Sequence, residues 1–235
     1  MRIDKFLSDM GIASRRETAK AAKAGQITVD GVAARDPAKH IDPERCRIFY
    51  QGREIAYRKY VYVMLNKPEG YVSATEDSRL PVVTELLSEE LRRMELFPVG
   101  RLDRDTVGLM ILTNNGGLAH ALLSPKRHVE KTYFFRAAEP LRDGAEEKFR
   151  DGVTLADGYE CKSAELSLSE DRLSGQIVLT EGKYHQIKRM IASEENRVTF
   201  LERTSFGGID LDRSLSRGEW RYLTDEETAL LESRG

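Results

Sequence analysis

The sequence contains only two cysteines, Cys46 and Cys161, and they lie far apart without forming a CxxC pair. Two such residues provide neither a disulfide framework nor a zinc cage. No stretch approaches the roughly 18 consecutive apolar residues of a membrane span. The opening residues also lack the apolar core of a secretory signal. From these absences we expect a protein without membrane segments that resides in a reducing cytoplasm.

The short motifs of several enzyme classes are also missing. The chain has no GxGxxG before a helix, no GxxxxGK[ST] and no GxSxG, which argues against a dehydrogenase, an ATPase and a serine hydrolase. Its four histidines, at positions 40, 120, 128 and 185, are scattered without metal-ligand spacing. We therefore expect no metal site.

What the chain does have is enough length for a real core, and its charge is distributed unevenly. It has 235 residues, of which 40% are hydrophobic and 32% charged, as in globular proteins. The net charge of −2 divides into +4 for residues 1–58 and −6 for residues 59–235. A basic front segment favours an anion-binding module joined to a second domain, although a chance division of charge is the alternative.

The front segment has the pattern of a small independent unit. Apolar residues at helical spacing predict a helix over residues 3–10. Ser14 and Glu17 form a capping box that predicts a second helix over residues 15–24. Asp30-Gly31 lies between short β-formers and predicts a hairpin. The unit is therefore expected to contain two short helices and a small β element.

The second of these helices would carry four cations near one side: Arg15, Arg16, Lys20 and Lys23. A positive helix face can bind phosphates, although four charges are also typical of a solvated helix surface. The segments RIDKFLSDMGIASRRE and AGQITVDG resemble the S-four type of RNA-binding domain over about the first 50 residues. The resemblance implies that residues 1–58 form a domain that docks RNA.

Residues 59–235 mix strand and helix patterns without a regular βαβ repeat. The patterns predict strands over residues 60–68, 109–113, 131–137, 166–168, 176–179 and 197–201. They predict helices over residues 81–91, 116–123 and 185–192. Residues 51–60 have the composition of a polar connector. This mixture predicts an α+β domain with a largely antiparallel or mixed sheet and flanking helices.

One segment of this larger domain concentrates ionisable residues. In VGRLDRDTVGL, Arg101, Asp103, Arg104 and Asp105 lie between a proline–glycine approach and a buried strand. An ionisable cluster at the mouth of a strand is a place where pKa values can be tuned. A capped loop with surface ion pairs is the alternative explanation.

Three separated segments resemble the pseudouridine synthases: PVGRLDRDTVGLMILTNNG, KTY at 131–133 and EGKYHQIKRM at 181–190. LNKPEGYVSA at 65–74 fits the same branch, which modifies ribosomal RNA and carries an S-four-like front domain. The resemblance spans nearly the whole chain in the expected order. ITVDG, TEGKYHQIKRM and FGGIDLD are most similar to the enzymes that modify small-subunit ribosomal RNA, and large-subunit relatives share much of this.

The resemblance implies roles for individual positions. Asp103 matches the catalytic aspartate, and Tyr133 matches the tyrosine that packs on the uracil. Lys188 matches the basic residue that pairs with the aspartate, where many relatives have arginine. Arg101 and Gln186 belong to the same motifs and are expected to contact the substrate.

The chemistry explains these residue types. Pseudouridylation breaks the bond from ribose to uracil nitrogen and re-forms it at ring carbon 5, without net redox change or hydrolysis. No cofactor and no metal are therefore expected. A carboxylate can act as nucleophile or base at the sugar, a cation close by favours its ionised form, and an aromatic ring stacks on the base.

The target uridine must leave its RNA stack to reach Asp103, which costs a few kcal/mol in a duplex. Contacts from the front domain and from cations near the motifs can offset this cost. We expect Arg104 and Lys131, with Lys126 and Arg127, to provide them. The resemblance implies ribosomal RNA or the assembling small subunit as partner, and we expect a monomer.

The sequence departs from the pattern at Glu195, where many relatives have glycine. A turn that needs positive φ would resist glutamate, although Asn196 tolerates that region.

Other functions remain open. A non-catalytic ribosome-assembly factor could keep the fold, and other RNA enzymes could carry the front domain. The intact Asp103, Tyr133 and Lys188 argue against the first, and the missing nucleotide and methyl-donor glycine loops argue against the second. Large-subunit ribosomal RNA or transfer RNA is an alternative substrate.

Overall fold

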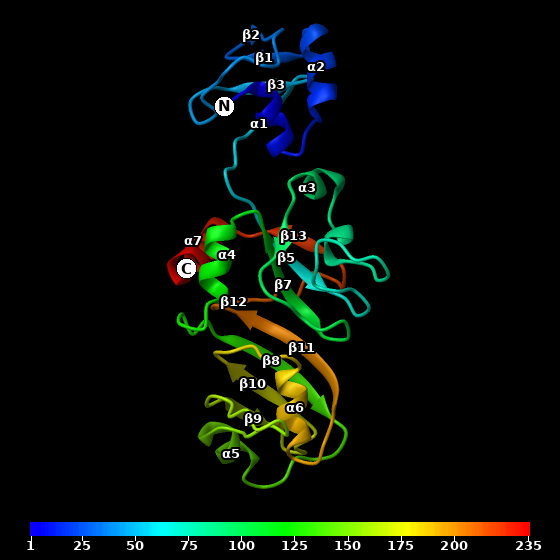
Figure 1. The fold of residues 1–235 in the computed structure, drawn as a ribbon, viewed down its shortest axis with the longest axis vertical. Helices are drawn as coiled ribbons and strands as arrows, with labels where there is room; N and C mark the ends of the chain where they lie inside the picture. The colour runs from blue at the N-terminus through cyan, green and yellow to red at the C-terminus, as the bar shows by residue number, and fades with distance from the viewer. The chain divides into compact units, whose positions relative to one another are not determined.

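The computed structural model describes residues 1–235 (Figure 1). The chain divides into two compact units. The small unit comprises Met1–Val61 together with Leu87–Leu96, and the large unit comprises Tyr62–Leu86 together with Phe97–Gly235. The domain boundary between residues 58 and 59 stays a prediction.

The small unit contains short helices and a four-stranded sheet. Its elements are α1 (Ile3–Asp9), α2 (Arg15–Lys23), β1 (Ile27–Val29), β2 (Val32–Ala33), β3 (Ile48–Tyr50), β4 (Arg53–Ile55) and α3 (Glu89–Arg93). The sheet order is β2-β1-β3-β4, and every pairing is antiparallel. Ser14 and Glu17 form the predicted capping box of α2, and Asp30-Gly31 joins β1 to β2 with positive φ at both residues. These predictions are confirmed.

One prediction for this unit is wrong. Residues 51–60 were expected to form a connector, but Arg53–Ile55 is strand β4, which pairs with β3 and closes the sheet. The strand is hard to recognise because only Ile55 is buried, whereas Arg53 and Glu54 are exposed. A three-residue edge strand with one apolar side chain has the same composition as a polar linker.

The large unit is built on a nine-stranded sheet. Its strands are β5 (Tyr62–Lys67), β6 (Phe97–Pro98), β7 (Val107–Thr113), β8 (Lys131–Ala137), β9 (Glu165–Leu168), β10 (Ser174–Leu179), β11 (Val198–Phe206), β12 (Ile209–Asp210) and β13 (Trp220–Tyr222). Its helices are the 3-10 helix η1 (Val83–Leu86), α4 (Gly116–Leu123), α5 (Ala145–Asp151), α6 (Gln186–Ala192) and α7 (Asp225–Arg234). The predicted α+β class with a mixed sheet is confirmed.

The strand order β13-β5-β7-β11-β8-β10-β9 places two strands from distant parts of the chain side by side at the centre. β7 and β11 run parallel, and the other pairings are antiparallel. The contact is close, because a Cβ at Gly108 would lie 2.3 Å from the carbonyl oxygen of Arg203. Gly108 also has φ +99, so this position needs glycine on both grounds.

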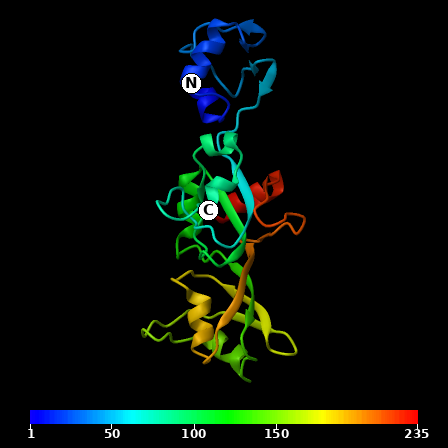
Figure 2. The ribbon, with the colours of Figure 1, turned by 90° about the vertical axis from the view of Figure 1, so that its right-hand side faces the viewer.

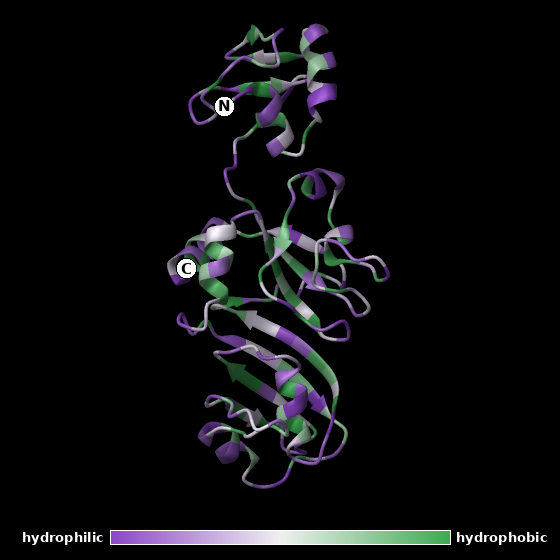
Figure 3. Ribbon diagram, viewed as in Figure 1, coloured by the Kyte–Doolittle hydropathy of each residue, from purple (hydrophilic) through white to green (hydrophobic).

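Helices cover this sheet in two places. A hydrophobic core that includes Met64, Leu109, Ile111, Leu122 and Leu231 joins β5 and β7 to α4 and α7, and α4 and α7 lie side by side in Figure 1. α6 packs against β11, as Figures 1 and 2 both show. Figure 3 colours α4 as largely hydrophobic and α5 as mostly hydrophilic. None of the helices combines enough length with enough apolar character to cross a bilayer.

The predicted helix over residues 81–91 is a second correction. The structure instead has η1, a break at Ser88, and α3. Ser88 adopts an extended backbone and its side chain accepts a hydrogen bond from the amide of Leu91, which starts a new helix. Helix α5, helix α7 and strands β6, β12 and β13 were not predicted.

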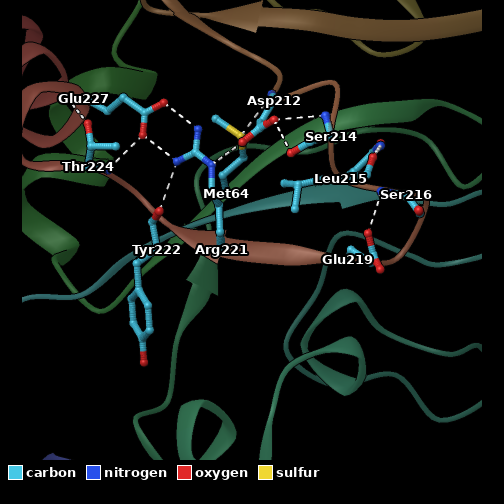
Figure 4. Close-up of polar contacts among 11 residues, drawn as sticks. Met64, Asp212, Ser214, Leu215, Ser216, Glu219, Arg221, Tyr222, Thr224 and Glu227 are labelled. Atoms are coloured by element: carbon cyan, nitrogen blue, oxygen red, sulfur yellow. Dashed lines mark hydrogen bonds and ion pairs between the residues drawn. The ribbon is translucent and has the colours of Figure 1, made fainter.

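The C-terminal elements are tied together by one arginine. Arg221 of β13 donates through Nε to Asp212 at 2.7 Å, and its two terminal nitrogens bind Glu227 of α7 at 2.7 and 2.8 Å (Figure 4). Glu227 is also the capping-box residue of α7, paired with Thr224. The arginine therefore links a strand, a loop and a helix start.

Candidate active site

Asp103 lies in the loop that precedes β7, and buried groups fix the shape of that loop. The side chain of Ser73 donates to the carbonyl of Leu102 at 2.8 Å and accepts from its amide at 2.9 Å. The amide of Thr106 donates to the carbonyl of Asp103 at 3.1 Å and closes a turn. Hydrogen bonds therefore hold the backbone of this loop, and the Asp103 side chain stays 27% exposed.

Lys67 provides a second anchor for this loop. Its ammonium lies 2.8–3.3 Å from four carbonyl oxygens, those of Pro68, Asp103, Arg104 and Thr106, so two of them share one of its three protons. The side chain is completely buried. Burial lowers the pKa of Lys67 to about 8, against the opposing charges of Asp105 and Asp103. The amine therefore stays largely protonated at pH 7, and the carbonyl oxygens of the loop all contact this one charged group.

Lys188 of α6 reaches two carboxylates of this loop. Its Nζ lies 3.0 Å from Asp103 Oδ2 and 2.6 Å from Asp105 Oδ1. Burial works against the charge of Lys188, but its hydrogen bonds to Asp105 and Asp103 outweigh burial and raise its pKa. Burial likewise opposes ionisation of Asp105, yet the hydrogen bond from Lys188 lowers its pKa. The Lys188 ammonium thus lies between the side chains of Asp103 and Asp105.

Tyr133 reaches the same pocket from β8, where it is 8% exposed. The pocket is lined by Arg101, Leu102, Asp103, Thr106, Tyr133, Leu179, Glu181, Lys183, His185, Gln186, Ile187, Lys188 and Leu201, among others. The three predicted catalytic residues, Asp103, Tyr133 and Lys188, therefore come together around one cavity. They belong to three segments that the central strands β7, β8 and β11 bring into register.

Several hydrogen bonds hold the segment before α6. His185 adopts a left-handed backbone with φ +49, and its Nε2 lies 3.4 Å from Asp103 Oδ1, an ion pair when the ring is doubly protonated. Gln186 is buried: its amide group donates to Glu181 at 2.6 Å and accepts from the amide of Lys183 at 2.8 Å. Glu181 also accepts from Tyr159 at 2.8 Å. Gln186 therefore lines the pocket while its polar atoms brace this loop.

The predicted RNA-contacting cations have different positions. Arg101 is exposed and lines the pocket. Arg104 is exposed but not part of the lining. Lys131 is turned inward, where it donates to the carbonyl of Val129 at 2.7 Å and lies over the ring of Phe206. Burial, with the charge of Arg203, lowers the pKa of Lys131 to about 8.

Arg15, Arg16 and Lys20 are exposed on α2 of the small unit. The side chains of this helix that are buried are Thr18, Ala21 and Ala22. The structure thus leaves the three cations in solvent, and their contact with RNA stays a prediction.

Sequence reasoning gave no site role to three residues that shape the site, Lys67, Glu181 and His185, and it named Asp105 only as part of an ionisable cluster. Asp105 and His185 lie two residues after Asp103 and three before Lys188, so spacing could have drawn attention to them. Lys67 and Glu181 also lie inside the quoted segments, but their roles depend on partners that the local sequence does not reveal. No group of His, Cys, Asp and Glu side chains has the geometry to hold a metal ion.

The turn at Glu195 does contain a residue with positive φ. It adopts φ +57 itself and pairs with Arg142. Asn196 braces the turn, accepting from the amide of Glu139 at 3.2 Å and donating to its carbonyl at 2.6 Å. Contacts from a neighbouring segment therefore hold a conformation that glutamate alone disfavours.

The sequence of the chain is similar to two known protein families and to several named proteins. Residues 61–193 match the family of RNA pseudouridylate synthases, and residues 1–45 match the S4 domain. The chain is 43% identical to the uncharacterized RNA pseudouridine synthase YtzG of Bacillus subtilis, covering 98% of both chains. It is 41% identical to ribosomal small subunit pseudouridine synthase A of Vibrio vulnificus, covering 97% of both.

Solved structures agree with the sequence comparisons. A crystal structure of a pseudouridylate synthase superposes with a TM-score of 0.70 at 33% identity, covering 98% of this chain and 99% of that one. The similarity therefore extends over both units.

Proposed function

Because the chain belongs to the RNA pseudouridylate synthase family, we propose that it converts a uridine of small-subunit ribosomal RNA to pseudouridine. The observation that carries this proposal is the contact of Asp103 with Lys188 at 3.0 Å in a pocket that Tyr133 also lines. The choice of small-subunit RNA rests on relatives of that name that match nearly the whole chain.

In this proposal Asp103 is the catalytic carboxylate. It acts as an anion at the ribose, either by attack on carbon 1 or by removal of a ribose proton. The bond from carbon 1 to uracil nitrogen 1 breaks and the base turns. As carbon 1 bonds to ring carbon 5, the bond from carbon 1 to Asp103 breaks in the first route, and Asp103 returns the proton to the ribose in the second. Carbon 5 then loses its proton and nitrogen 1 gains one, so the product is an isomer of the substrate.

Lys188 orients Asp103, because its ammonium lies within hydrogen-bond distance of the Asp103 side chain. Tyr133 offers a ring on which the uracil stacks, and its hydroxyl is available for proton transfer. Arg101 meets the RNA at the mouth of the pocket, and Arg104 and Lys131 stay weaker candidates for such contacts. The S4 domain docks RNA through α2.

The proposal is tested by mapping pseudouridine in total ribosomal RNA from cells that lack the protein. Complementation compares the wild-type protein with Asp103→Asn, which keeps the shape of the side chain and removes its charge. We expect one small-subunit site to be lost and to return only with the wild type.

Other outcomes would correct or overturn the proposal. A lost large-subunit or transfer RNA site would retain the reaction and change the substrate. Full rescue by Asp103→Asn would remove Asp103 from its role. No lost site, with ribosome binding intact, would favour a non-catalytic assembly factor. The assembling small subunit as substrate, a monomeric state and a cytoplasmic location stay predictions.

A further inference from the structure

Tyr184 is an unusual side chain for the edge of an active site. It is 73% exposed, more than any other large hydrophobic residue of the chain. It immediately precedes His185, whose imidazole lies 3.4 Å from Asp103. Exposing an aromatic ring to water is unfavourable, and this ring lies outside the buried core.

The ring is nevertheless held in place. Its centroid lies 3.8 Å from that of the His185 ring, and the two planes differ by 20°. His185 in turn has a fixed left-handed backbone and faces the catalytic carboxylate. The Tyr184 carbonyl accepts from Arg189 at 3.4 Å. One face of the tyrosine is therefore covered by His185, and the other face is left to solvent.

The surroundings suit a polyanion with flat bases. Lys183 is exposed next to Tyr184, and Arg101 is exposed where it lines the pocket. Arg189 is less available, because it pairs with Asp157 at 2.5 Å. The ammonium of Lys183 lies 4.7 Å from the centroid of the Tyr159 ring, although the side chain is exposed. An exposed aromatic ring with cations nearby is the arrangement with which proteins bind unstacked nucleotides.

We propose that Tyr184 is a stacking platform for the nucleobase that neighbours the target uridine in the RNA strand. Extrusion of the uridine leaves its neighbour without a stacking partner. The exposed face of Tyr184 replaces that partner beside the pocket. The inference rests on the proposed function and adds a binding position to it, separate from the place of the uracil on Tyr133.

The test uses a synthetic RNA segment spanning the site found by pseudouridine mapping, in the natural sequence and with an abasic residue at each position beside the uridine. Single-turnover kinetics give the apparent RNA affinity and the rate at saturating RNA for wild type, Tyr184→Ala and Tyr184→Trp. Tyr222→Ala is the control, because it removes a partly exposed ring outside the pocket.

We expect Tyr184→Ala to weaken the apparent affinity by about 5- to 150-fold, which corresponds to the loss of one base–aromatic stack. The saturated rate should change little, and Tyr184→Trp should restore the affinity. One abasic RNA should weaken wild-type binding similarly and cause no further loss with Tyr184→Ala. Tyr222→Ala should bind as the wild type does.

Three results would overturn the inference. These are an unchanged affinity for Tyr184→Ala, losses that add for every abasic RNA, or a fall in the saturated rate alone, which would mean that the ring only supports His185. If the wild type itself modifies no RNA, the proposed function fails instead, so the two failures are distinguishable.

Discussion

At the scale of single residues, Lys67 anchors the loop that carries Asp103 although it lies outside the pocket lining. Lys67→Met keeps the length of the side chain and removes its donors. We expect each carbonyl left without a donor to cost about 1–3 kcal/mol of unfolding free energy. We expect displacement of the loop to lower the turnover rate by about 10²-fold. Chemical denaturation and pseudouridine formation measure the two effects.

Lys162→Met is the matched control for this prediction, since Lys162 is an exposed lysine of the same unit. It should leave both quantities near their wild-type values. A Lys67→Met protein with wild-type turnover would show that the loop keeps its shape without the ammonium.

The sequence predicts the residues of the pocket that lie in recognisable motifs, and it fails where a role comes from distant partners. Asp103, Tyr133 and Lys188 were identified by resemblance, and the structure brings them together around one pocket. Lys67 binds carbonyls 36–39 positions away. Only the pairing of β5 with β7 places it there, and no local pattern encodes that pairing.

At the scale of elements, the attachment of β13 and α7 depends on charge and should therefore depend on pH. Hydrogen bonds from Ser214 and from Arg221 lower the pKa of Asp212 to about 2. Its pKa in the unfolded chain is about 3.9. Because the folded pKa is the lower one, the stabilisation is complete above about pH 4 and is lost as the pH falls to about 2.

Asp212→Asn should therefore lower the unfolding free energy at pH 7. Its difference from the wild type should shrink between about pH 4 and pH 2. Denaturant titrations at a series of pH values measure this, with Asp210→Asn as an exposed control on the neighbouring strand. A difference that stayed constant over this range would exclude the charge of Asp212 as its cause.

Elements with a strong local pattern were predicted, and those defined by their neighbours were not. The strand over residues 131–137 has the predicted bounds because its apolar residues alternate. The helix expected over residues 81–91 breaks at Ser88 because a side-chain cap competes with apolar periodicity. Strand β13 has three residues, each at least partly exposed, so only its pairing with β5 defines it.

At the scale of the whole molecule, the acidic net charge poses a problem for an RNA-binding enzyme, and local charge has to overcome it. The chain carries −2 overall, yet α2 presents Arg15, Arg16 and Lys20 to solvent. If these cations contact phosphates, they release counterions, and binding should weaken steeply with salt. If they are only solvated, overall charge alone should govern RNA binding.

Replacing Arg15, Arg16 and Lys20 together by glutamate separates these possibilities. We expect weaker RNA binding and a salt dependence whose slope falls by up to about 3, since each phosphate contact contributes about 0.9. Unfolding free energy should change little, because the three side chains are exposed. The control replaces Arg136, Arg150 and Arg234, exposed arginines of the large unit, by glutamate and changes the total charge equally. Filter binding of small-subunit ribosomal RNA over a series of salt concentrations measures both proteins. Equal losses would mean that total charge governs binding, whereas a loss confined to the first protein assigns RNA docking to α2.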